Sequence, residues 1–412
     1  MEFSKFTQKM YWAVVFLGFY SGVIICGGVK PEVVNVGCML ILTSPVGRVT
    51  KLAVETAVEE VNSSKQTVLG GRKLNITMLD STASGFLGIV EAIRFMETNT
   101  VAIIGPQSSV IAHVISHIAS EVQVPLLSSA AADPTLTSLQ FPFFVRTCPN
   151  DLFQMAAVAS MVEHYEWRKV VAIYIDDDYG RNGIAALGDQ LAMRRCQISY
   201  KAALKPEATV DDIRDVLIQV ALMESRVLVV HTYPDKSSLN IFSVAKSLKM
   251  MESGYVWITT HWLSTVFDTV GPFSPDTMED IQGVVTLRIH TPDSSLKRRF
   301  ISRWSNMTRE LGMRGNQHLG LCTHGLYAYD SVWLLARALA AFFKQGGNIS
   351  FSKDPRLEGN GGGRLRLDSM TVFDGGNLLR EMIFKTEMTG VTGPFRYRKK
   401  KIYLNKNKLV PK

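Results

Sequence analysis

Motifs that carry catalysis are missing from this 412-residue sequence. It has no Gly-x-Ser-x-Gly nucleophile elbow, no phosphate-binding P-loop and no Gly-x-Gly-x-x-Gly after a strand. His113 and His117 stand four apart on an expected helix, but HVISH lacks the glutamate of a zinc HExxH motif and no third ligand is spaced to join them. We therefore predict no catalytic residue, no metal site and no cofactor, which leaves an enzyme as the least favoured class.

Cysteine is scarce, with five residues in the chain. Cys26 falls in an N-terminal targeting segment, and Cys38, Cys148, Cys196 and Cys322 are scattered without a Cys-x-x-Cys pair. This spacing opposes a zinc ribbon and a thioredoxin-type redox site. A disulfide among the last four and four small buried thiols are both open.

Apolar runs long enough to span a membrane are missing too. The apolar run 11–25 follows Lys5 and Lys9 and precedes small residues, and it is shorter than the roughly 20 residues of a spanning helix. We predict a cleaved secretory signal at 1–28, with an uncleaved anchor as the alternative. The run 331–343 is shorter still and carries Arg337, which predicts a buried helix of a globular domain.

Acidic residues are absent from position 396 onward, where eight Lys and Arg gather. The remaining 37 bases balance the 37 acids, so the net charge of +8 lies entirely in this tail. A nucleic-acid-binding domain would show a basic face on its folded part, so we predict no nucleic-acid partner. The tail itself is either a disordered end or a segment that binds an anionic surface.

Four Asn-x-Ser/Thr sequons are present, at Asn62, Asn75, Asn306 and Asn348. In a secretory compartment each is a plausible glycan acceptor on the surface. We therefore predict a glycoprotein of the secretory pathway.

The length and the element pattern indicate two α/β lobes. At about 150 residues per domain the chain holds two to three domains. From residue 33 onward short β-branched runs alternate with helical stretches, as in doubly wound parallel sheets, and nine or ten strands exceed one such sheet. The expected strands are 33–39, 74–79, 101–104, 124–127, 143–146, 170–175, 198–202, 227–232, 255–259 and 283–287. The expected helices are 49–61, 86–96, 109–121, 152–164, 183–194, 211–223, 238–251, 296–311 and 323–343. Prolines near 142–149 and 272–292 mark candidate hinges.

Two loops of small and hydroxyl side chains each follow an expected strand. VAIIGPQSS ends in Ser108 and Ser109 at a helix start, and VPLLSSAAADPT repeats the arrangement with Ser129, Ala130 and Ala132. Free N–H groups at helix starts bind carboxylates, and small side chains let a ligand approach the backbone. The alternative is simple N-capping, by Ser108 or Asp133.

A third loop, VVAIYIDDDYGRNG, ends a strand in three aspartates. Carboxylates at a strand's carboxyl end often meet a ligand, but Asp176, Asp177 and Asp178 also suit a turn and the cap of the next helix. We favour the cap for the acids and expect Tyr179 to face a cleft.

The blocks IIGPQSSVIAHVISHIASEVQVPLLSSAAADPTLTSLQFPFFVRT, WRKVVAIYIDDDYGRNGIAAL, LRLDSMTVFDGG and TGVTGPF occur in this order. Together they resemble the amino-terminal domain of plant glutamate receptor-like channels, over about residues 33–395. That domain is of the type I periplasmic-binding-protein class. The resemblance implies two hinged lobes: 29–147 with 291–390, and 148–290. It leaves a terminal strand and basic tail at 391–412.

The resemblance also implies an interlobe ligand site. In amino-acid-binding relatives, Ser108, Ser109, Ser129, Ala130 and Ala132 would meet the ligand carboxylate. The other lobe would supply the remaining groups, namely Tyr179, His231 and Tyr233 in 231–233, and Thr260 in 259–261. Relatives often carry a hydroxyl where Ala132 stands and an acid near Thr260, so the ligand's identity is open.

The implied function is the extracellular ligand-sensing domain of a ligand-gated cation channel that binds an amino-acid-like ligand. The alternative is a dimerisation or assembly domain without a ligand, and other receptor subunits are expected partners in either case. Relatives continue from TGVTGPF toward a pore, whereas this sequence turns into YRKKKIYLNKNKLVPK. We expect a shortened isoform or gene model that lacks the pore. It would be secreted or lumenal, whereas a full-length receptor lies in the plasma membrane.

Overall fold

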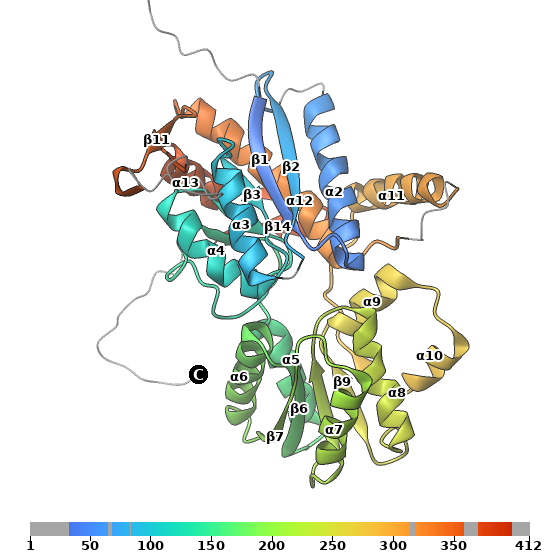
Figure 1. Cartoon of the computed structure of the whole chain (residues 1–412). Coiled ribbons are helices and arrows are strands. Elements are labelled where there is room, and N and C mark those ends of the chain that lie inside the picture. Colours follow the sequence, from blue (N-terminus) through green and yellow to red (C-terminus); the bar gives the residue numbers. More distant parts are fainter. Residues whose placement is uncertain (1–32, 65–67, 83, 314–318, 358–369, 398–412) are drawn as a thin grey trace, which may run out of the picture. The chain divides into compact units, whose positions relative to one another are not determined.

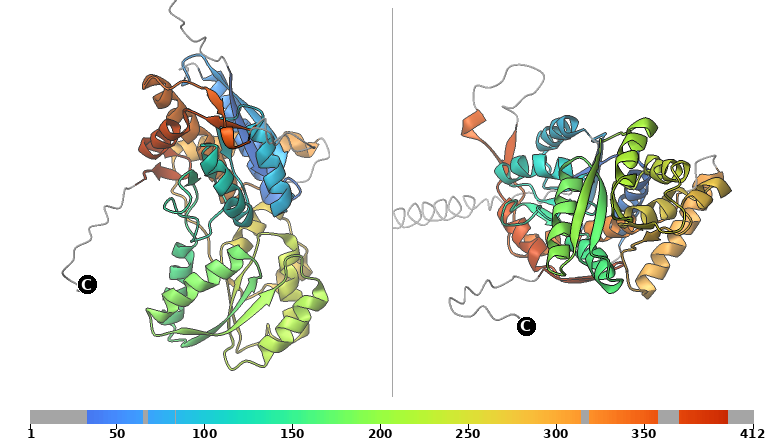
Figure 2. Two further views of the ribbon diagram at one scale, coloured as in Figure 1. Left: turned by 60° about the vertical axis from the view of Figure 1, so that its left-hand side comes forward. Right: turned by 90° about the horizontal axis from the view of Figure 1, so that it is seen from below.

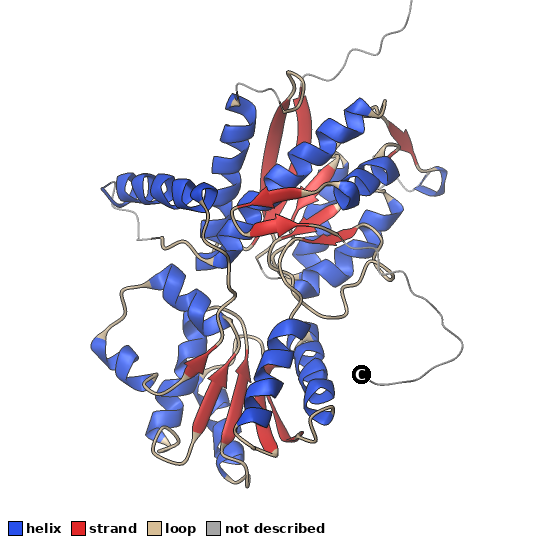
Figure 3. Cartoon of the chain, turned by 180° about the vertical axis from the view of Figure 1, so that it is seen from behind, coloured by secondary structure: helices blue, strands red, loops and turns tan. Residues whose placement is uncertain are grey.

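The computed structural model describes residues 33–64, 68–82, 84–313, 319–357 and 370–397, so the expected signal segment and most of the basic tail lie outside it. Two five-stranded sheets dominate these residues, with strand orders β2-β1-β3-β4-β5 and β10-β9-β8-β6-β7 (Figures 1 and 3). All pairings within both sheets are parallel. The predicted fold class, two doubly wound parallel-sheet lobes, is therefore confirmed.

The strands of the first sheet are β1 (Val33–Leu40), β2 (Lys73–Asp80), β3 (Ala102–Ile104), β4 (Leu126–Ser128) and β5 (Phe144–Arg146). Those of the second are β6 (Lys169–Ile175), β7 (Gln197–Leu204), β8 (Val227–His231), β9 (Val256–Thr259) and β10 (Val285–Thr286). Two antiparallel pairs join β11 (Phe351–Lys353) to β12 (Thr371–Phe373), and β13 (Met388–Gly390) to β14 (Gly393–Phe395). Because parallel neighbours share a direction, the carboxyl ends of each sheet's strands meet at one edge, where ligands bind in such sheets.

The crossover helices begin where polar caps stand. Side chains of Ser44, Ser84, Ser108, Asp177 and Thr209 accept hydrogen bonds at the starts of five helices and satisfy otherwise unpaired N–H groups. The helices up to residue 221 are α2 (Pro45–Ser63), α3 (Gly85–Met96), α4 (Ser109–Glu121), α5 (Leu152–His164), α6 (Asp178–Ala192) and α7 (Val210–Ala221). The later ones are η1 (Lys236–Leu239), α8 (Asn240–Ser247), α9 (Trp262–Val270), α10 (Pro275–Asp280), α11 (Ser295–Met313), α12 (Thr323–Lys344), η2 (Pro355–Leu357) and α13 (Gly376–Lys385).

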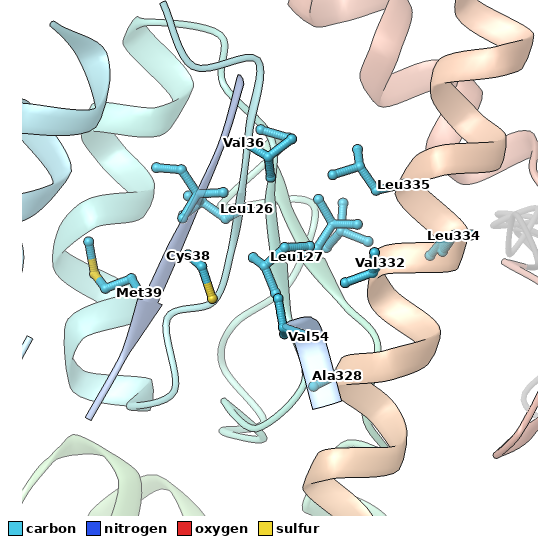
Figure 4. Packing of buried hydrophobic residues seen from close by; sticks show 14 of the residues in the cluster. Val36, Cys38, Met39, Val54, Leu126, Leu127, Ala328, Val332, Leu334 and Leu335 are labelled. Carbon is cyan, nitrogen blue, oxygen red and sulfur yellow. The ribbon is translucent and has the colours of Figure 1, made fainter. Parts of the chain in front are cut away.

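Each sheet has its own apolar core. The first sheet packs with α11, α12 and α13 in one cluster, and Figure 4 shows Val332 and Leu335 of α12 beside Leu127 of β4 and Val36 of β1. The second sheet carries a cluster on each face, under the helices on its two sides (Figure 2). The domain bounds inferred from the sequence stay a prediction.

Helix α12 confirms the expected buried helix around Arg337. Among the described residues it is the helix long and apolar enough to span a membrane, but 72% of its apolar window is buried inside the protein. That burial is what a core helix shows.

The expected helix 238–251 is shorter in the structure. A 3-10 turn, η1, precedes α8, which ends at Ser247, and Lys249 adopts a left-handed φ of 59°. The short elements α9, α10, α13 and β11 to β13 were not anticipated, because runs of three to ten residues carry too little periodicity.

Cys38, Cys148, Cys196 and Cys322 are buried free thiols. Burial raises the pKa of Cys148 to about 12 and that of Cys322 to about 11, so both stay protonated. The sequence left a disulfide and four buried thiols open, and the structure shows the buried thiols.

Candidate functional site

The loop after β3 is shaped by Gly105 and by two serines that serve the fold. Gly105 has a φ of +118°, and a Cβ there would overlap the carbonyl of Met39 in β1. Ser108 Oγ accepts a hydrogen bond from Ile111 N (3.5 Å), which makes Ser108 the N-cap of α4. Ser109 Oγ accepts one from Asp133 N (3.4 Å), so this side chain ties the loop after β3 to the loop after β4.

The loop after β4 folds around Ser128. Its hydroxyl donates to Pro106 O (2.7 Å) and accepts from Ala131 N (2.9 Å). Ser129 and Ala132 are buried and Ala130 is half-buried. The predicted carboxylate-binding residues therefore lie together at the carboxyl edge of the first sheet.

Asp133 ends this loop and links the two sheets. Its Oδ2 accepts from Asn182 Nδ2 of α6 (2.9 Å) and lies 3.0 Å from His113 Nε2 of α4. Burial disfavours the charged carboxyl, but hydrogen bonds from His113, Asn182 and Thr135 outweigh it and lower the pKa of Asp133. His113 therefore has a structural partner, and no cluster of three possible metal-ligating residues occurs in the described part of the chain.

The three aspartates after β6 mainly serve the start of α6. Asp177 Oδ1 accepts from Gly180 N (2.9 Å), and the Tyr233 hydroxyl donates to its Oδ2. Asp176 pairs with Arg181 (2.9 Å), and Asp178 is the first residue of the helix. The capping interpretation of this acidic run agrees with these contacts.

Tyr179, His231 and Tyr233 form a stack at the carboxyl edge of the second sheet. The Tyr179 ring lies 5.2 Å from that of Tyr233 and 4.4 Å from that of His231. His231 Nδ1 lies 3.0 Å from Thr260 Oγ1. The four residues predicted for the second lobe thus come together, with Tyr179, His231 and Thr260 buried.

Asp151 is the feature of this cluster that sequence reasoning missed. Its Oδ1 accepts from Gln154 Nε2 (2.7 Å), whereas its Oδ2 makes no hydrogen bond of ordinary geometry to a described residue and has the Tyr179 hydroxyl beside the carboxyl. Oδ2 faces His231 Nε2 at 3.8 Å, too far for a hydrogen bond, and that nitrogen is also without one. Two buried polar atoms without partners are uncommon and call for an explanation.

Burial sets the charges of this cluster. Burial raises the pKa of Asp151 to about 7, although interactions with Gln154, Arg146 and Tyr179 lower that pKa in part. It lowers the pKa of His231 to about 3, and that of His261 far below its ordinary value. The imidazoles are therefore neutral near pH 7, and Asp151 is a buried carboxyl poised between its two charge states.

Gln154 and two histidines extend the cluster to the first sheet. Gln154 Oε1 accepts from His261 N (3.0 Å), and the His261 ring lies 5.4 Å from that of His324 on α12. His324 Nδ1 approaches Ser129 O at 3.3 Å. Asp151 could have been found from the sequence, because it lies in CPND, between an expected strand and an expected helix. Nothing in the sequence places His324 in this cluster.

Gly183 leaves room for the His231 ring, because it has no side chain. A Cβ at Gly183 would overlap His231 Nε2 and lie 3.2 Å from Met155 Cε. We expect Gly183→Ala to displace His231 and to destabilise the protein by about 1–3 kcal/mol in thermal unfolding. Gly188→Ala on the same helix is the control: its Cβ would meet only Ile198 Cδ1 at 3.7 Å, and helix propensity favours it by about 0.5–1 kcal/mol. Equal melting temperatures for the two variants would contradict this account.

The predicted glycan acceptors differ in exposure. Asn75, Asn306 and Asn348 are exposed. Asn62 is half-buried, and its amide both donates to Leu74 O (2.9 Å) and accepts from Leu74 N (2.8 Å). Glycosylation at the four sites stays a prediction.

Comparison with known proteins relates the chain to receptors and to binding proteins. Residues 49–403 match the family model of the receptor family ligand binding region. Among curated proteins, the chain is 51% identical over 368 residues to glutamate receptor 3.4 of Arabidopsis thaliana, covering 89% of this chain and 37% of that one. It is 49% identical over 368 residues to glutamate receptor 3.1 of Oryza sativa subsp. japonica, covering 89% and 39%. The chain thus spans about two fifths of the length of these relatives.

Solved structures support the fold. A leucine-binding protein of Thermotoga maritima superimposes with a TM-score of 0.65 at 18% identity, covering 88% of this chain and 91% of that one. An ABC transporter substrate-binding protein of Desulfitobacterium hafniense, in complex with Leu, gives 0.61 at 18% identity, covering 89% and 93%. The chain is similar to part of plant glutamate receptors, and it belongs to the receptor family ligand binding region, a family of receptors and not of enzymes.

Proposed function

We propose that this chain senses an amino-acid-like ligand, bound between the carboxyl edges of its two sheets, on the extracellular side of a receptor. The observation that carries the proposal is the buried Asp151 carboxyl with one oxygen unpaired beside an unpaired His231 nitrogen. A ligand ammonium would give Asp151 its missing charge-assisted hydrogen bonds. The Tyr179 and Tyr233 rings beside it offer an apolar wall.

The other end of the ligand would meet the first sheet. Backbone N–H groups at the start of α4 and small side chains at Ala130 and Ala132 suit a carboxylate. The link from Asn182 to Asp133 joins the two halves beside this position. A ligand that contacts both sheets better when they are close would shift the chain toward that state, which is how a signal would reach the rest of a receptor and its channel.

Calorimetry tests this function. The purified chain is titrated with a panel of amino acids and small peptides, and at least one member should give saturable heat. If no member of the panel gave measurable heat of binding, the proposed sensing function would be wrong.

An assembly function is the second candidate, and helix α3 favours it. Its sequence GFLGIVEAIRFM is apolar on nearly every face, yet Phe86 is 71% and Leu87 39% exposed. A helix that is apolar all round is normally covered, so this face suits a second copy of the chain or a related subunit.

We expect the double variant Phe86→Ser with Leu87→Ser to shift the chain from dimer to monomer in light scattering. Phe153→Ser is the control, because this side chain is equally exposed but lies on α5. A wild-type chain that is monomeric at high concentration would contradict the assembly function.

A further inference from the structure

A cavity of about 430 Å³ lies away from the polar cluster, between α11, α12 and β13. This volume is in the range of small-molecule sites, roughly 300–1,000 Å³. The lining residues come from four elements: Glu60 of α2; Leu296, Arg299, Phe300 and Arg303 of α11; Tyr329, Asp330, Trp333 and Arg337 of α12; and Met388, Thr389 and Gly390 of β13. On each long helix the lining residues recur three or four positions apart, so one face of each helix forms a wall.

Two of the three arginines in this wall form no ion pair with a described residue. Arg303 donates to Glu59 Oε2 and Glu60 Oε1, both at 2.7 Å, so its charge is already matched. Arg299 and Arg337 are exposed and make neither a hydrogen bond nor an ion pair with any described residue. Their guanidinium groups carry donors in a planar fork that fits a carboxylate.

A third donor comes from Trp333. Its indole Nε1 is shielded from solvent and makes no hydrogen bond of ordinary geometry to a described residue. The neighbouring Tyr329 hydroxyl donates to Glu60, and its oxygen lies beside the indole without forming a hydrogen bond of ordinary geometry to it. A buried N–H without a well-placed acceptor is destabilising, and a ligand oxygen in the cavity would supply that acceptor.

The remaining wall is apolar. Leu296, Phe300 and Met388 line it, and the Phe300 and Tyr329 rings lie 4.3 Å apart. We propose that this cavity binds a small organic carboxylate with an aromatic body, held by Arg299, Arg337 and the Trp333 indole. The aromatic body would pack on the apolar wall, and the carboxylate would sit at the arginine-lined mouth.

The cavity also touches the hairpin of β13 and β14. Asp330, in its wall, accepts from Val391 N and Thr392 N, both at 2.8 Å, and so fixes the hairpin turn. A Cβ at Gly390 would overlap the Asp330 carboxylate, so this backbone lies against it. A ligand in the cavity therefore packs against the segment that ends the described chain.

The test is fluorine NMR of the full chain with fluorophenylacetate as the probe. We expect saturable line broadening, and the double variant Arg299→Gln with Arg337→Gln should weaken the probe at least about tenfold, because charge-assisted hydrogen bonds are lost. Neither side chain has a partner among the described residues, so the variant should fold, as circular dichroism will show. The neutral amide, fluorophenylacetamide, should bind wild type correspondingly weakly.

Two further variants locate the probe. Arg298→Gln is the matched control: this arginine is next in sequence, pairs with Asp293 and does not line the cavity. It should leave probe affinity within twofold, and so should Asp151→Asn in the polar cluster. Absence of probe binding, unchanged affinity in the double variant, or equal binding of the amide would each overturn the proposal. Loss of binding in Asp151→Asn would place the probe in the other site and overturn it as well.

Discussion

Asp151→Asn is expected to weaken binding of the amino-acid ligand about 100-fold or more at pH 7.5. The change keeps the shape of the side chain and its hydrogen bond from Gln154, but removes the charge that would meet a ligand ammonium. Losing one partner of a buried charged pair typically costs about 3–5 kcal/mol, and each 1.4 kcal/mol is tenfold in affinity. Calorimetric titration with the tightest ligand of the panel measures the change.

Asp178→Asn is the control for this variant. Asp178 lies in the first turn of α6, near the same edge of the second sheet, but it is exposed and its carboxylate pairs with Arg181 at 3.9 Å. Its affinity should equal that of wild type. If Asp151→Asn bound as tightly as wild type, Asp151 would not be the ligand's partner and the proposed site would be wrong.

The Asp151→Asn variant should also be more stable than wild type. A carboxyl whose pKa is raised on folding contributes stability that is present below its unfolded pKa, near 4, and is lost as pH rises through its folded pKa of about 7. Wild type therefore carries a penalty on the order of 4 kcal/mol above neutral pH, which the asparagine does not. In thermal unfolding, the advantage of Asp151→Asn should grow between pH 5 and pH 7.5. An advantage that shrinks as pH rises would mean that burial does not raise the Asp151 pKa.

The strands and long helices could be predicted because their signal is local. Buried parallel strands such as β6 and β8 are short β-branched runs, and α12 carries apolar residues at helical spacing over six turns. The prediction was wrong for 248–251, the last four residues of the expected helix 238–251, because Leu248 and Lys249 leave the helical conformation, and the apolar periodicity does not indicate this. Two sheets then followed from the number of strands alone.

The site could be predicted only where it follows strand ends. Ser108, Ser129 and Tyr179 stand just after strands and His231 is the last residue of β8, and the topology brings strand ends to one edge. The resemblance to a known family added their roles, which stay proposals.

The burial of single side chains and the contacts between residues far apart in the chain could not be predicted from the sequence. His324 stands near the start of α12, nearly 200 residues from its partner Ser129 in the chain, and only the packing of α12 along the first sheet brings them together. The aspartates 176–178 drew attention by their number, yet Asp177 caps α6 and the other two pair with Arg181. The single Asp151 is buried, and its Oδ2 lacks a hydrogen-bond partner among the described residues. Desolvation, which gives Asp151 its unusual chemistry, is a property of the folded surroundings and not of the residue type.

Ligand affinity should rise steeply with pH because binding needs the ionised form of Asp151. The groups that face Asp151 are Gln154, Arg146 and Tyr179, which favour the carboxylate, and Asp133, which opposes it. None of these titrates between pH 5.5 and 7.5: Asp133 is ionised throughout, Tyr179 stays protonated, and the neutral His231 has a pKa of about 3. Among the groups that face one another at this position, Asp151 is therefore the one that changes its charge in this window.

With a pKa of about 7 in the free protein, Asp151 is mostly protonated at pH 5.5 and mostly ionised at pH 7.5. If the bound state holds it ionised, the apparent Kd should fall roughly 25-fold between these two pH values. Binding at pH 6 should release about 0.9 of a proton, which calorimetry in two buffers of different ionisation enthalpy measures directly. In Asp151→Asn both effects should vanish while any residual binding stays flat with pH. A Kd that rises with pH in wild type, or uptake of a proton on binding, would show that the ligand prefers the neutral acid, and the ligand would then present a hydrogen-bond acceptor to Asp151 and not an ammonium.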